Sequence, residues 1–507
     1  MKYLYLNIIL FIAFGWFVLV YSIGRDQFSK DKEHLSYQKD EEDGIRTIAS
    51  NLNVPLEIAW GPDNQIWIAE HAGVISKMDP QTGNKQVLLK LTDVWQSRTA
   101  GLLGMALHSD MKKFPYVFLC YTIQKDKKYL IRLVRYKSDK DTLNDPKVLM
   151  EIPAANGHNG SRIAVQGGLL YWATGDALSL TDSQNPKTPN GKILRMNIDG
   201  SAASDNPMKG NPVWAWGFRN IQGMVFSKSG QLYTSEHGDA TDDEINLIGK
   251  AKNYGWPTVQ GFAESVEETT FKGLHNTIDP IKAWTPTIAP AGLDYYSYDK
   301  IPALKNSLLL VTLKGKSFRA LKLDNEGKKV LSEQVYFENK FGRIRDLCVS
   351  PAGDVYLATS NRDWNPVSGF PTPADDRIIK ISKLDPENPQ NMLSSIPPGS
   401  KSALLYQQYC ASCHKDNGMG VKGTFPSLLT SLVVVNNPKE FIRKILTGSN
   451  GPATINGVTY DTPMPSFAFL KNEDLIDITT YVRSLGSNHA APIKPELIKE
   501  VRTALNK

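Results

Sequence analysis

The sequence predicts an all-β six-bladed β-propeller followed by a small all-α domain, with an apolar anchor segment at the N-terminus. Two observations predict the propeller. Short strand-like runs recur along the middle of the chain at intervals of about 50 to 75 residues, and turns rich in Gly, Asp or Asn separate them. Six such units over residues 46–383 give about 56 residues each, the size of a four-stranded blade with its loops. Two β-sandwiches are the alternative, but they do not explain the recurrence.

One strand in each unit carries the recurrence, and these runs are rich in β-branched, aliphatic and aromatic residues. They cover residues 65–69, 116–120, 169–173, 231–234, 307–311 and 354–358. Most are followed by a strand that mixes basic and apolar residues and ends at Asp or Gly, such as residues 74–79 and 318–324.

The first two dozen residues form a separate apolar segment. Residues 3–24 carry no charge, and about 22 helical residues span roughly 33 Å, enough to cross a bilayer. A cleavable signal peptide has a shorter apolar core and an Ala-x-Ala-like site, which is absent here. We therefore predict an uncleaved transmembrane anchor over residues 1–24, with a signal peptide as the alternative, and a charged tether over residues 25–45.

Composition excludes some classes of partner. The net charge of +6 over 507 residues is modest, and no Lys/Arg run is long enough to indicate nucleic-acid binding. Cys120 and Cys348 are isolated, so they support no disulfide framework, and the sequence leaves open whether they pair.

Near the C-terminus stands the run Cys410-Ala411-Ser412-Cys413-His414. This spacing places two thiols against the vinyl groups of a haem and an imidazole on its iron. Half of a zinc site or a redox dithiol is the alternative, but a second CxxC is absent. We predict haem c bound covalently through Cys410 and Cys413, with His414 as an iron ligand.

An electron-transfer haem needs a sixth iron ligand, and a methionine sulfur raises its potential. Met464 lies between Pro463 and Pro465 in a polar loop, which is a poor position for a core methionine. Met419 is the rival, but it follows His414 too closely to reach the opposite face of the ring easily. We predict Met464 as the second ligand.

Residues 400–486 resemble a class I cytochrome c domain, with the haem motif on a first helix, the methionine in a loop and an amphipathic helix over residues 472–485. A Pro-rich linker, residues 384–399, precedes the domain, and residues 487–507 are expected to form a tail. Because haem c of this kind is attached outside the bacterial cytoplasmic membrane, the resemblance places the chain on the periplasmic face, or free in the periplasm if the N-terminal segment is cleaved.

Four stretches of the middle region resemble the soluble PQQ-dependent glucose and aldose sugar dehydrogenases, over essentially all of residues 46–383. They are residues 101–108, 157–163 with 173–176, 217–223, and 235–257. The resemblance implies oxidation of an aldose sugar, from the anomeric hydroxyl to the lactone, with pyrroloquinoline quinone (PQQ) as cofactor. A propeller alone names no function, so these loops carry the inference.

PQQ is a planar o-quinone with three carboxylates, so its pocket needs guanidinium and ammonium groups. The residues that match the family's cofactor-binding pattern are Arg219, Asn220, Thr287, Lys314, Arg343 and Arg345. Any one of these basic residues alone is most simply a surface charge. Their coincidence in matching loops indicates a PQQ pocket.

The same resemblance implies calcium, which binds oxygen ligands on tight turns that contain glycine. The backbone carbonyls of Gly238 and Asp239 are expected to hold an ion that polarises the quinone. Asp243, Glu244 and Tyr254 resemble a second, structural calcium site, although an acidic run is more often a solvated turn.

His158 is the predicted catalytic base. Its neutral imidazole can accept the hydroxyl proton of the sugar as hydride leaves the anomeric carbon. The other histidines are expected to be turn or core residues, although His237 adjoins the predicted calcium loop.

The sequence departs from the glucose-oxidising members on the substrate side of the pocket. The departures are Gly157 for an acidic residue, Thr99 and Ala177 for glutamines, and Lys282 and Thr285 for an aromatic pair over the cofactor. Trp284 is expected to supply part of the lost stacking surface. These changes put glucose specificity in doubt and leave PQQ chemistry in place.

Two functions from different classes compete. In the first, the chain is a membrane-tethered sugar dehydrogenase that passes electrons from PQQ to its own haem, and on to a cytochrome or oxidase of the respiratory chain. In the second, the propeller is a non-catalytic binding module that docks a cytochrome to a partner. A histidine base beside a cofactor cradle favours the first, because a binding module needs no base.

Overall fold

The structure is a computed structural model that describes residues 44–384 and 400–505, apart from residues 416, 430, 450, 456, 487 and 489. The predicted anchor, most of the tether and almost all of the linker therefore lie outside the described residues. Among the helices that are described, none combines the length and apolar character that a membrane span requires.

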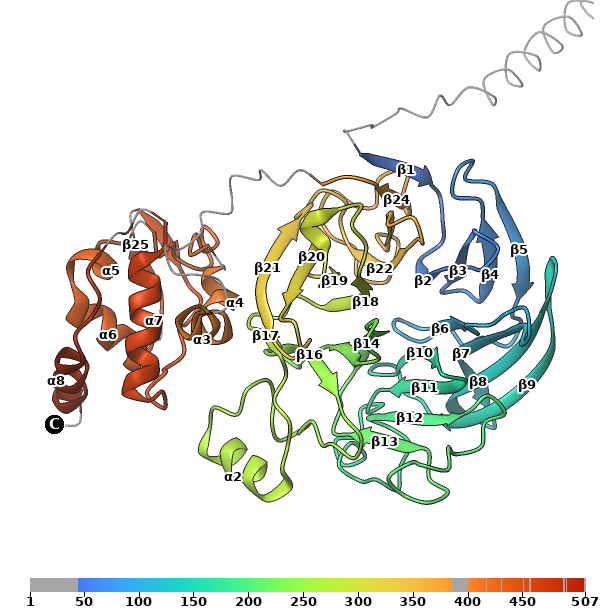
Figure 1. Cartoon of the computed structure of the whole chain (residues 1–507), viewed down its shortest axis with the longest axis horizontal. Coiled ribbons are helices and arrows are strands. Elements are labelled where there is room, and N and C mark those ends of the chain that lie inside the picture. Colours follow the sequence, from blue (N-terminus) through green and yellow to red (C-terminus); the bar gives the residue numbers. More distant parts are fainter. Residues whose placement is uncertain are drawn as a thin grey trace, which may run out of the picture. The chain divides into compact units, whose positions relative to one another are not determined.

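Residues 45–381 form six four-stranded antiparallel sheets that follow one another around a common centre (Figure 1). The first blade consists of β2 (Pro55–Trp60), β3 (Ile66–Glu70), β4 (Val74–Met78) and β5 (Lys85–Lys90). The second consists of β6 (Leu102–Leu107), β7 (Tyr116–Lys125), β8 (Lys128–Asp139) and β9 (Thr142–Pro153). The third consists of β10 (Gly160–Gln166), β11 (Leu169–Thr174), β12 (Lys192–Asn197) and β13 (Val213–Trp216). The prediction of a six-bladed propeller is confirmed.

The last three blades complete the ring. The fourth blade consists of β14 (Ile221–Phe226), β15 (Leu232–Glu236), β16 (Asp243–Ile248) and β17 (Lys282–Trp284). The fifth consists of β18 (Pro290–Tyr296), β19 (Ser307–Thr312), β20 (Phe318–Leu323) and β21 (Val330–Tyr336). The sixth consists of β22 (Ile344–Val349), β23 (Val355–Thr359), β24 (Ile378–Ile381) and β1 (Ile45–Ala49). The loop between β16 and β17 carries helix α2 (Val266–His275), and a short 3-10 helix, η1 (Pro302–Leu304), precedes β19. Strand β1 pairs with β24, Ile45 opposite Ile381, so the two ends of the propeller sequence close one sheet.

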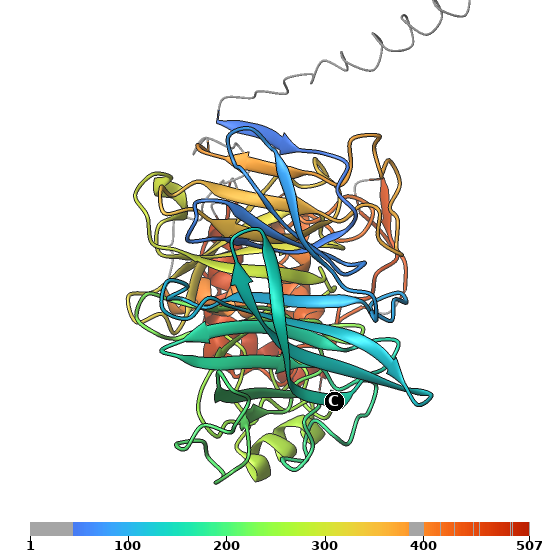
Figure 2. The same ribbon diagram turned by 90° about the vertical axis from the view of Figure 1, so that its right-hand side faces the viewer.

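The strand runs found in the sequence are the second strands of the blades. Strands β3, β15 and β23 are buried at every position, because neighbouring blades cover both of their faces. The fourth strand of a blade lies at its edge, and β5 is mostly exposed, which explains its weaker signal. In Figure 2 the long strands β7 to β9 of the second blade cross the foreground.

Residues 400–505 form the all-α domain. Its elements are α3 (Lys401–Tyr409), α4 (Ala411–His414), α5 (Leu432–Asn436), α6 (Pro438–Thr447), α7 (Asn472–Ser484), α8 (Pro495–Leu505) and a small hairpin, β25 (Ala453–Ile455) with β26 (Val458–Tyr460). The predicted closing helix is α7, and its N-cap residue is Lys471. Residues 487–507 were expected to be a tail, but they include α8, whose Ile498 and Val501 are buried in the core of this domain.

A buried charge cluster joins the inner strands at the centre of the propeller. Arg162 on β10 pairs with Glu57 on β2 and with Asp346 on β22, each at 3.1 Å. The second oxygen of Glu57 accepts a hydrogen bond from the Met105 N–H at 2.6 Å, and that of Asp346 accepts one from the Ile58 N–H at 2.7 Å. Burial raises the pKa of both carboxyl groups, and Arg162 opposes that shift.

We predict that Arg162→Met destabilises the propeller, because it leaves two buried carboxyl groups without their cation. Breaking a buried ion cluster in this way costs about 3–5 kcal/mol. The measurement is the thermal unfolding midpoint at a fixed scan rate. The control is Arg132→Met, which removes a more accessible arginine paired with Asp93 and Glu151 and should cost about 0–1 kcal/mol. Equal shifts in the two variants would contradict the prediction.

Candidate active site

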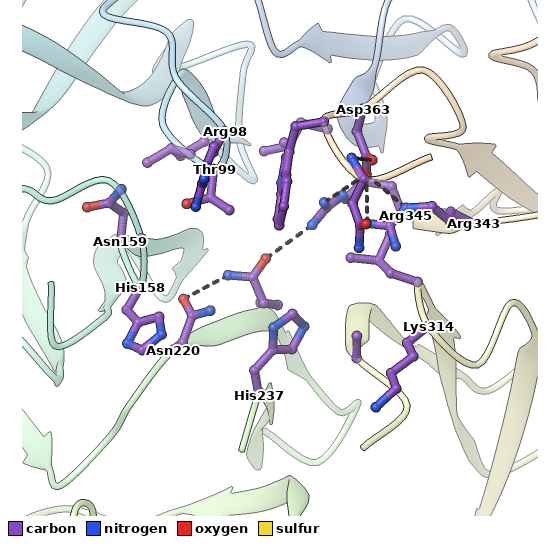
Figure 3. Close-up of a pocket in the computed structure, with 18 of the residues that line it drawn as sticks. Arg98, Thr99, His158, Asn159, Asn220, His237, Lys314, Arg343, Arg345 and Asp363 are labelled. Carbon is purple, nitrogen blue, oxygen red and sulfur yellow. Dashed lines mark hydrogen bonds and ion pairs between the residues drawn. The ribbon is translucent and has the colours of Figure 1, made fainter. Parts of the chain in front are cut away.

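A cavity of about 820 Å³ opens at the centre of the propeller, and loops of all six blades line it (Figure 3). This volume is within the range of small-molecule and cofactor sites. The structure brings together in its wall these residues that the sequence had singled out: His158, Arg219, Asn220, Gly238, Asp239, Asp243, Thr287, Lys314, Arg343 and Arg345.

His158 is fixed by a buried carboxylate. Its Nδ1 lies 3.0 Å from Oδ1 of Asp176, which is fully buried and accepts a second hydrogen bond, at Oδ2, from the Trp256 indole at 2.8 Å. Because an ionised carboxylate only accepts, this contact assigns the imidazole proton to Nδ1 and leaves Nε2 as a proton acceptor. His158 also adopts a φ of 52°, an unusual conformation for this residue type.

Two carboxylates in the cavity wall position its arginines. Asp363 pairs with Arg343 at 2.8 Å and lies 3.8 Å from Arg345, and Asp239 pairs with Arg219 at 2.8 Å. Burial, with the charge of Arg343 nearby, lowers the pKa of Arg345 to about 10. At neutral pH Arg345 is therefore still a cation.

Two buried donors in the wall of this cavity, Nε of Arg219 and Nε of Arg345, have no partner among the described residues, and the ring nitrogen Nε2 of His237 is likewise buried without one. Burial, together with the two arginines, lowers the pKa of His237 to about 3, so its ring is neutral. Unpaired buried donors are rare because each costs free energy, and a basic cavity that carries them fits an anionic ligand such as PQQ.

Lys314 and Asn220 also line the cavity, and with Arg219, Arg343 and Arg345 they form the group that we call the cradle. Lys314 is exposed, and its Nζ donates to Thr287 Oγ1 at 2.7 Å. Asn220 Oδ1 accepts from the Gly160 N–H and from Gln222 Nε2, both at 3.1 Å, and Gln222 in turn accepts from Arg345 at 3.2 Å. These hydrogen bonds connect the loop that carries His158 to Arg345, and Figure 3 draws those between the side chains.

The residues predicted to bind calcium separate into two groups. Gly238, Asp239 and Asp243 line the cavity, and Asp243 fixes the turn by accepting from the Gly238 N–H at 2.9 Å. Glu244 points to the opposite face of its strand, where it accepts from the Gly261 N–H at 2.6 Å. Tyr254 stacks on Phe218, away from the cavity wall. No group of three or more His, Cys, Asp or Glu side chains in the described part of the chain is arranged to hold a metal.

Two expectations about side chains at the site were wrong. Trp284 is 2% exposed and its indole donates to Glu333, so it offers no surface to the cofactor. Lys282 also pairs with Glu333, at 3.2 Å. Because Glu333 binds both Trp284 and Lys282, these two side chains lie between neighbouring blades. His237 was expected to be a turn or core residue, but it lies in the cavity wall.

Sequence reasoning gave no role to several residues of the site. Asp176 ends a stretch that had been singled out, and a carboxylate directly after a buried strand was the available signal. Arg98 and Trp364 also line the cavity, from loops in which no motif marks them, and so does the buried His71, which was expected to be a turn or core residue. Cys120 and Cys348 are both buried and are not paired with each other.

The predicted haem ligands lie in the all-α domain. His414 Nδ1 donates to the carbonyl of Pro426 at 2.8 Å, which leaves Nε2 to bind a metal, as metal-binding histidines usually do. Met464 exchanges two backbone hydrogen bonds with Ser449, at 2.9 and 3.0 Å, and packs against the core of the domain. The rival Met419 is 50% exposed, so the structure favours Met464.

A basic cavity on the axis of a propeller, with a carboxylate-backed histidine in its wall, has the composition expected of a quinoprotein dehydrogenase site. Residues 52–366 match the family model described as Glucose / Sorbosone dehydrogenase, and the chain belongs to this family. Residues 400–486 match the Cytochrome c family model.

Individual proteins agree with both matches. Quinoprotein glucose dehydrogenase B of Acinetobacter calcoaceticus is 29% identical over 410 residues, which cover 63% of this chain and 86% of that protein. The PQQ-bound aldose sugar dehydrogenase of Streptomyces coelicolor superposes with a TM-score of 0.59 at 31% identity, over 68% of this chain and 99% of that one. Cytochrome c-552 of Thermus thermophilus is 30% identical over 106 residues, 20% of this chain and 80% of that protein. The chain is an oxidoreductase of the PQQ sugar dehydrogenase type that carries a cytochrome c domain.

We predict that Asp176→Asn lowers turnover by at least about tenfold, because an amide no longer fixes the proton on Nδ1 of His158. Cofactor affinity should stay close to that of the wild type, since Asp176 is not a cavity-lining residue. The measurements are kcat and PQQ affinity. The control is Asp182→Asn in the same loop, and equal turnover in both variants would contradict the prediction.

We predict that Met464→Ala abolishes the sulfur-to-iron absorption band and keeps the haem, because the thioether bonds through Cys410 and Cys413 remain. The measurement is the absorption spectrum of the oxidised protein. Met419→Ala is the matched control and should keep the band. If the band is lost in Met419→Ala and retained in Met464→Ala, the ligand assignment is wrong.

Proposed function

We propose that this chain oxidises an aldose sugar at its anomeric hydroxyl to the lactone and passes the electrons to the haem of its own cytochrome c domain. One observation carries the proposal. His158, which Asp176 holds from behind, lines the same cavity as Arg219 and Arg345, whose Nε donors are buried and unpaired. A proton acceptor and an anion cradle therefore face one space.

The residues of the cavity have distinct roles in this proposal. Arg219, Arg343, Arg345 and Lys314 hold the carboxylates of PQQ, and bound PQQ supplies the two-electron acceptor to which the anomeric hydride moves. His158 Nε2 accepts the proton of the sugar hydroxyl, and Asp176 stabilises the imidazolium that results. Asn220 keeps the loop of His158 and the cofactor cradle in a fixed relation through its two hydrogen bonds.

We include a calcium ion in the proposal, bound by backbone carbonyls of the turn at Gly238 and Asp239. A side chain at Gly238 would meet the Thr241 carbonyl at 1.8 Å, so this turn folds tightly on itself and requires glycine. Backbone carbonyls of such a turn are suitable Ca²⁺ ligands. Asp243, which was predicted for the second calcium site, lines the cavity beside this turn and becomes a candidate for the first ion, whereas Glu244 and Tyr254 lie outside the cavity wall.

In this proposal the haem of the cytochrome c domain is the acceptor of the electrons. His414 and Met464 hold the haem iron as a one-electron carrier, which accepts electrons one at a time and delivers them to a downstream cytochrome or oxidase. We infer that this happens on the periplasmic face of the bacterial cytoplasmic membrane, because haem c of this kind is attached there. Residues 1–24 would hold the enzyme to that membrane.

The experiment is haem reduction by a panel of aldoses in the full chain loaded with PQQ and Ca²⁺. Wild-type protein should develop the spectrum of reduced haem c. His158→Ala should bind PQQ with similar affinity and lose about 10²- to 10⁴-fold in kcat, because only the proton acceptor is removed. His275→Ala is the control, since this exposed histidine lies on α2, outside the cavity wall.

Two results would overturn the proposal. If His158→Ala oxidised sugar within tenfold of the wild type, His158 would have no part in the mechanism. If wild-type protein bound PQQ and no aldose reduced the haem, the propeller would be the non-catalytic binding module.

A further inference from the structure

The cavity holds more positive charge than the cofactor cradle uses. Eight basic side chains and three carboxylates line it. Apart from Lys314, which belongs to the cradle, the basic lining residues without an ion pair to any carboxylate in the described part of the chain are Arg98, Lys316 and Arg362. A bound tricarboxylate would neutralise the cradle and leave these charges at the mouth, where the substrate enters.

Arg98 lies at the tip of a tight hairpin. Ser97 and Ala100 exchange backbone hydrogen bonds of 2.9 and 2.6 Å, and Arg98, between them, has a φ of 40°. Asn, Asp or Gly are the residues that favour this conformation, and arginine is disfavoured there. A strained residue at the mouth of an active site indicates that its side chain has a function.

The hairpin is tied to the loop that carries the base. Ser97 Oγ donates to Asn156 Oδ1 at 2.9 Å, and Thr99 Oγ1 donates to the Asn156 carbonyl at 3.5 Å, two residues before His158. Figure 3 shows Arg98 and Thr99 on the side of the cavity that bears Asn159 and His158. Arg98 is therefore held in a fixed relation to the reacting centre.

Gly157 keeps the space beside His158 open and uncharged. A Cβ at this position would contact only Leu178, at 3.7 Å. Because glycine has no side chain, no negative charge stands at this position beside His158 to repel an anionic substrate.

Trp364 stands opposite the hairpin. It is 51% exposed, and the guanidinium carbon of Arg98 lies 5.7 Å from the centre of its ring. Its neighbour Asp363 holds the cofactor arginine Arg343. A cation–π contact of this length holds a guanidinium near an indole and leaves its N–H groups available to bind a carboxylate or phosphate.

We propose that Arg98 and Trp364 form a subsite for the anionic end of an acidic sugar, so that the preferred substrate is an aldose with a terminal carboxylate or phosphate. This inference rests on the proposed function. The anomeric carbon still loses hydride to the cofactor and a proton to His158, and the anionic group takes no part in the reaction. Arg98 binds it through paired N–H donors, Trp364 offers an apolar face to the sugar ring, and Lys316 and Arg362 add to the attraction.

The experiment compares glucose, glucuronate and glucose 6-phosphate as reductants of the haem in the full chain loaded with PQQ and Ca²⁺. We expect kcat/KM for one of the anionic sugars to exceed that for glucose by at least about tenfold, and the difference to shrink as salt screens the charges. The two anionic sugars distinguish a carboxylate from a phosphate as the recognised group.

Substitutions assign the preference to the subsite. Arg98→Gln should lower kcat/KM for the anionic sugar by about 10- to 100-fold more than for glucose, the range expected for a charge-assisted hydrogen bond. Arg98→Lys should give an intermediate effect, since it keeps the charge and loses the planar donors. Arg46→Gln on β1 is the control and should change neither value, because Arg46 is outside the cavity wall.

The outcomes separate the subsite from the proposed function. If glucose is the better substrate and Arg98→Gln affects all three sugars equally, the subsite inference is wrong and sugar oxidation stands. If no sugar reduces the haem, the proposed function fails. The subsite is then still tested by calorimetric titration of the PQQ- and Ca²⁺-loaded His158→Ala protein with glucuronate and glucose 6-phosphate. Binding of either that Arg98→Gln weakens at least tenfold supports the subsite, and any other result overturns it.

Discussion

Arg162 is the buried cation on which the centre of the propeller depends. Its ion pairs with Glu57 and Asp346 join inner strands β10, β2 and β22, and its Nε donates to the Gln222 carbonyl of β14 at 2.6 Å. A propeller has no single core, because each blade packs mainly on its neighbours. Contacts that cross the axis therefore fix how the inner strands meet, and with them the loops that surround the cavity.

Arg162 also adds to the electrostatic repulsion among the arginines that line the cavity. Arg162 and Arg343 both lower the pKa of Arg345, so the cradle consists of charges that repel one another and are only partly balanced by Asp363. A planar tricarboxylate relieves this repulsion and pairs the orphaned donors of Arg219 and Arg345 in one step. Binding energy of that kind would also stabilise the folded propeller, since the ligand does not bind the unfolded chain.

The sequence predicts the features that consecutive residues encode better than the contacts between residues far apart in the chain. The second strands, such as β3 and β23, are covered on both faces and so appear as continuous apolar runs. The haem motif is five consecutive residues, and the cofactor cations were assigned through resemblance because they come from distant loops. Trp284 was misjudged because Glu333, which binds its indole, lies in another blade and has no local signature. No local pattern predicts that Arg98 and Trp364 meet, because they come from the first and the last blade loops.

Charge also explains why cofactor and substrate can be selected by different residues of one cavity. The cradle arginines are held by Asp363 and Asp239, so their positions hardly depend on what enters the mouth. Arg98 is held differently, by a strained turn and by an aromatic face, and its N–H donors remain available. Under the proposal, substitution at the hairpin tip is therefore expected to change which sugar is attracted without moving Arg219, Arg343 or Arg345. In contrast, a change at Asn220 or Gln222 would disturb both, because these two side chains connect the loop of His158 to Arg345.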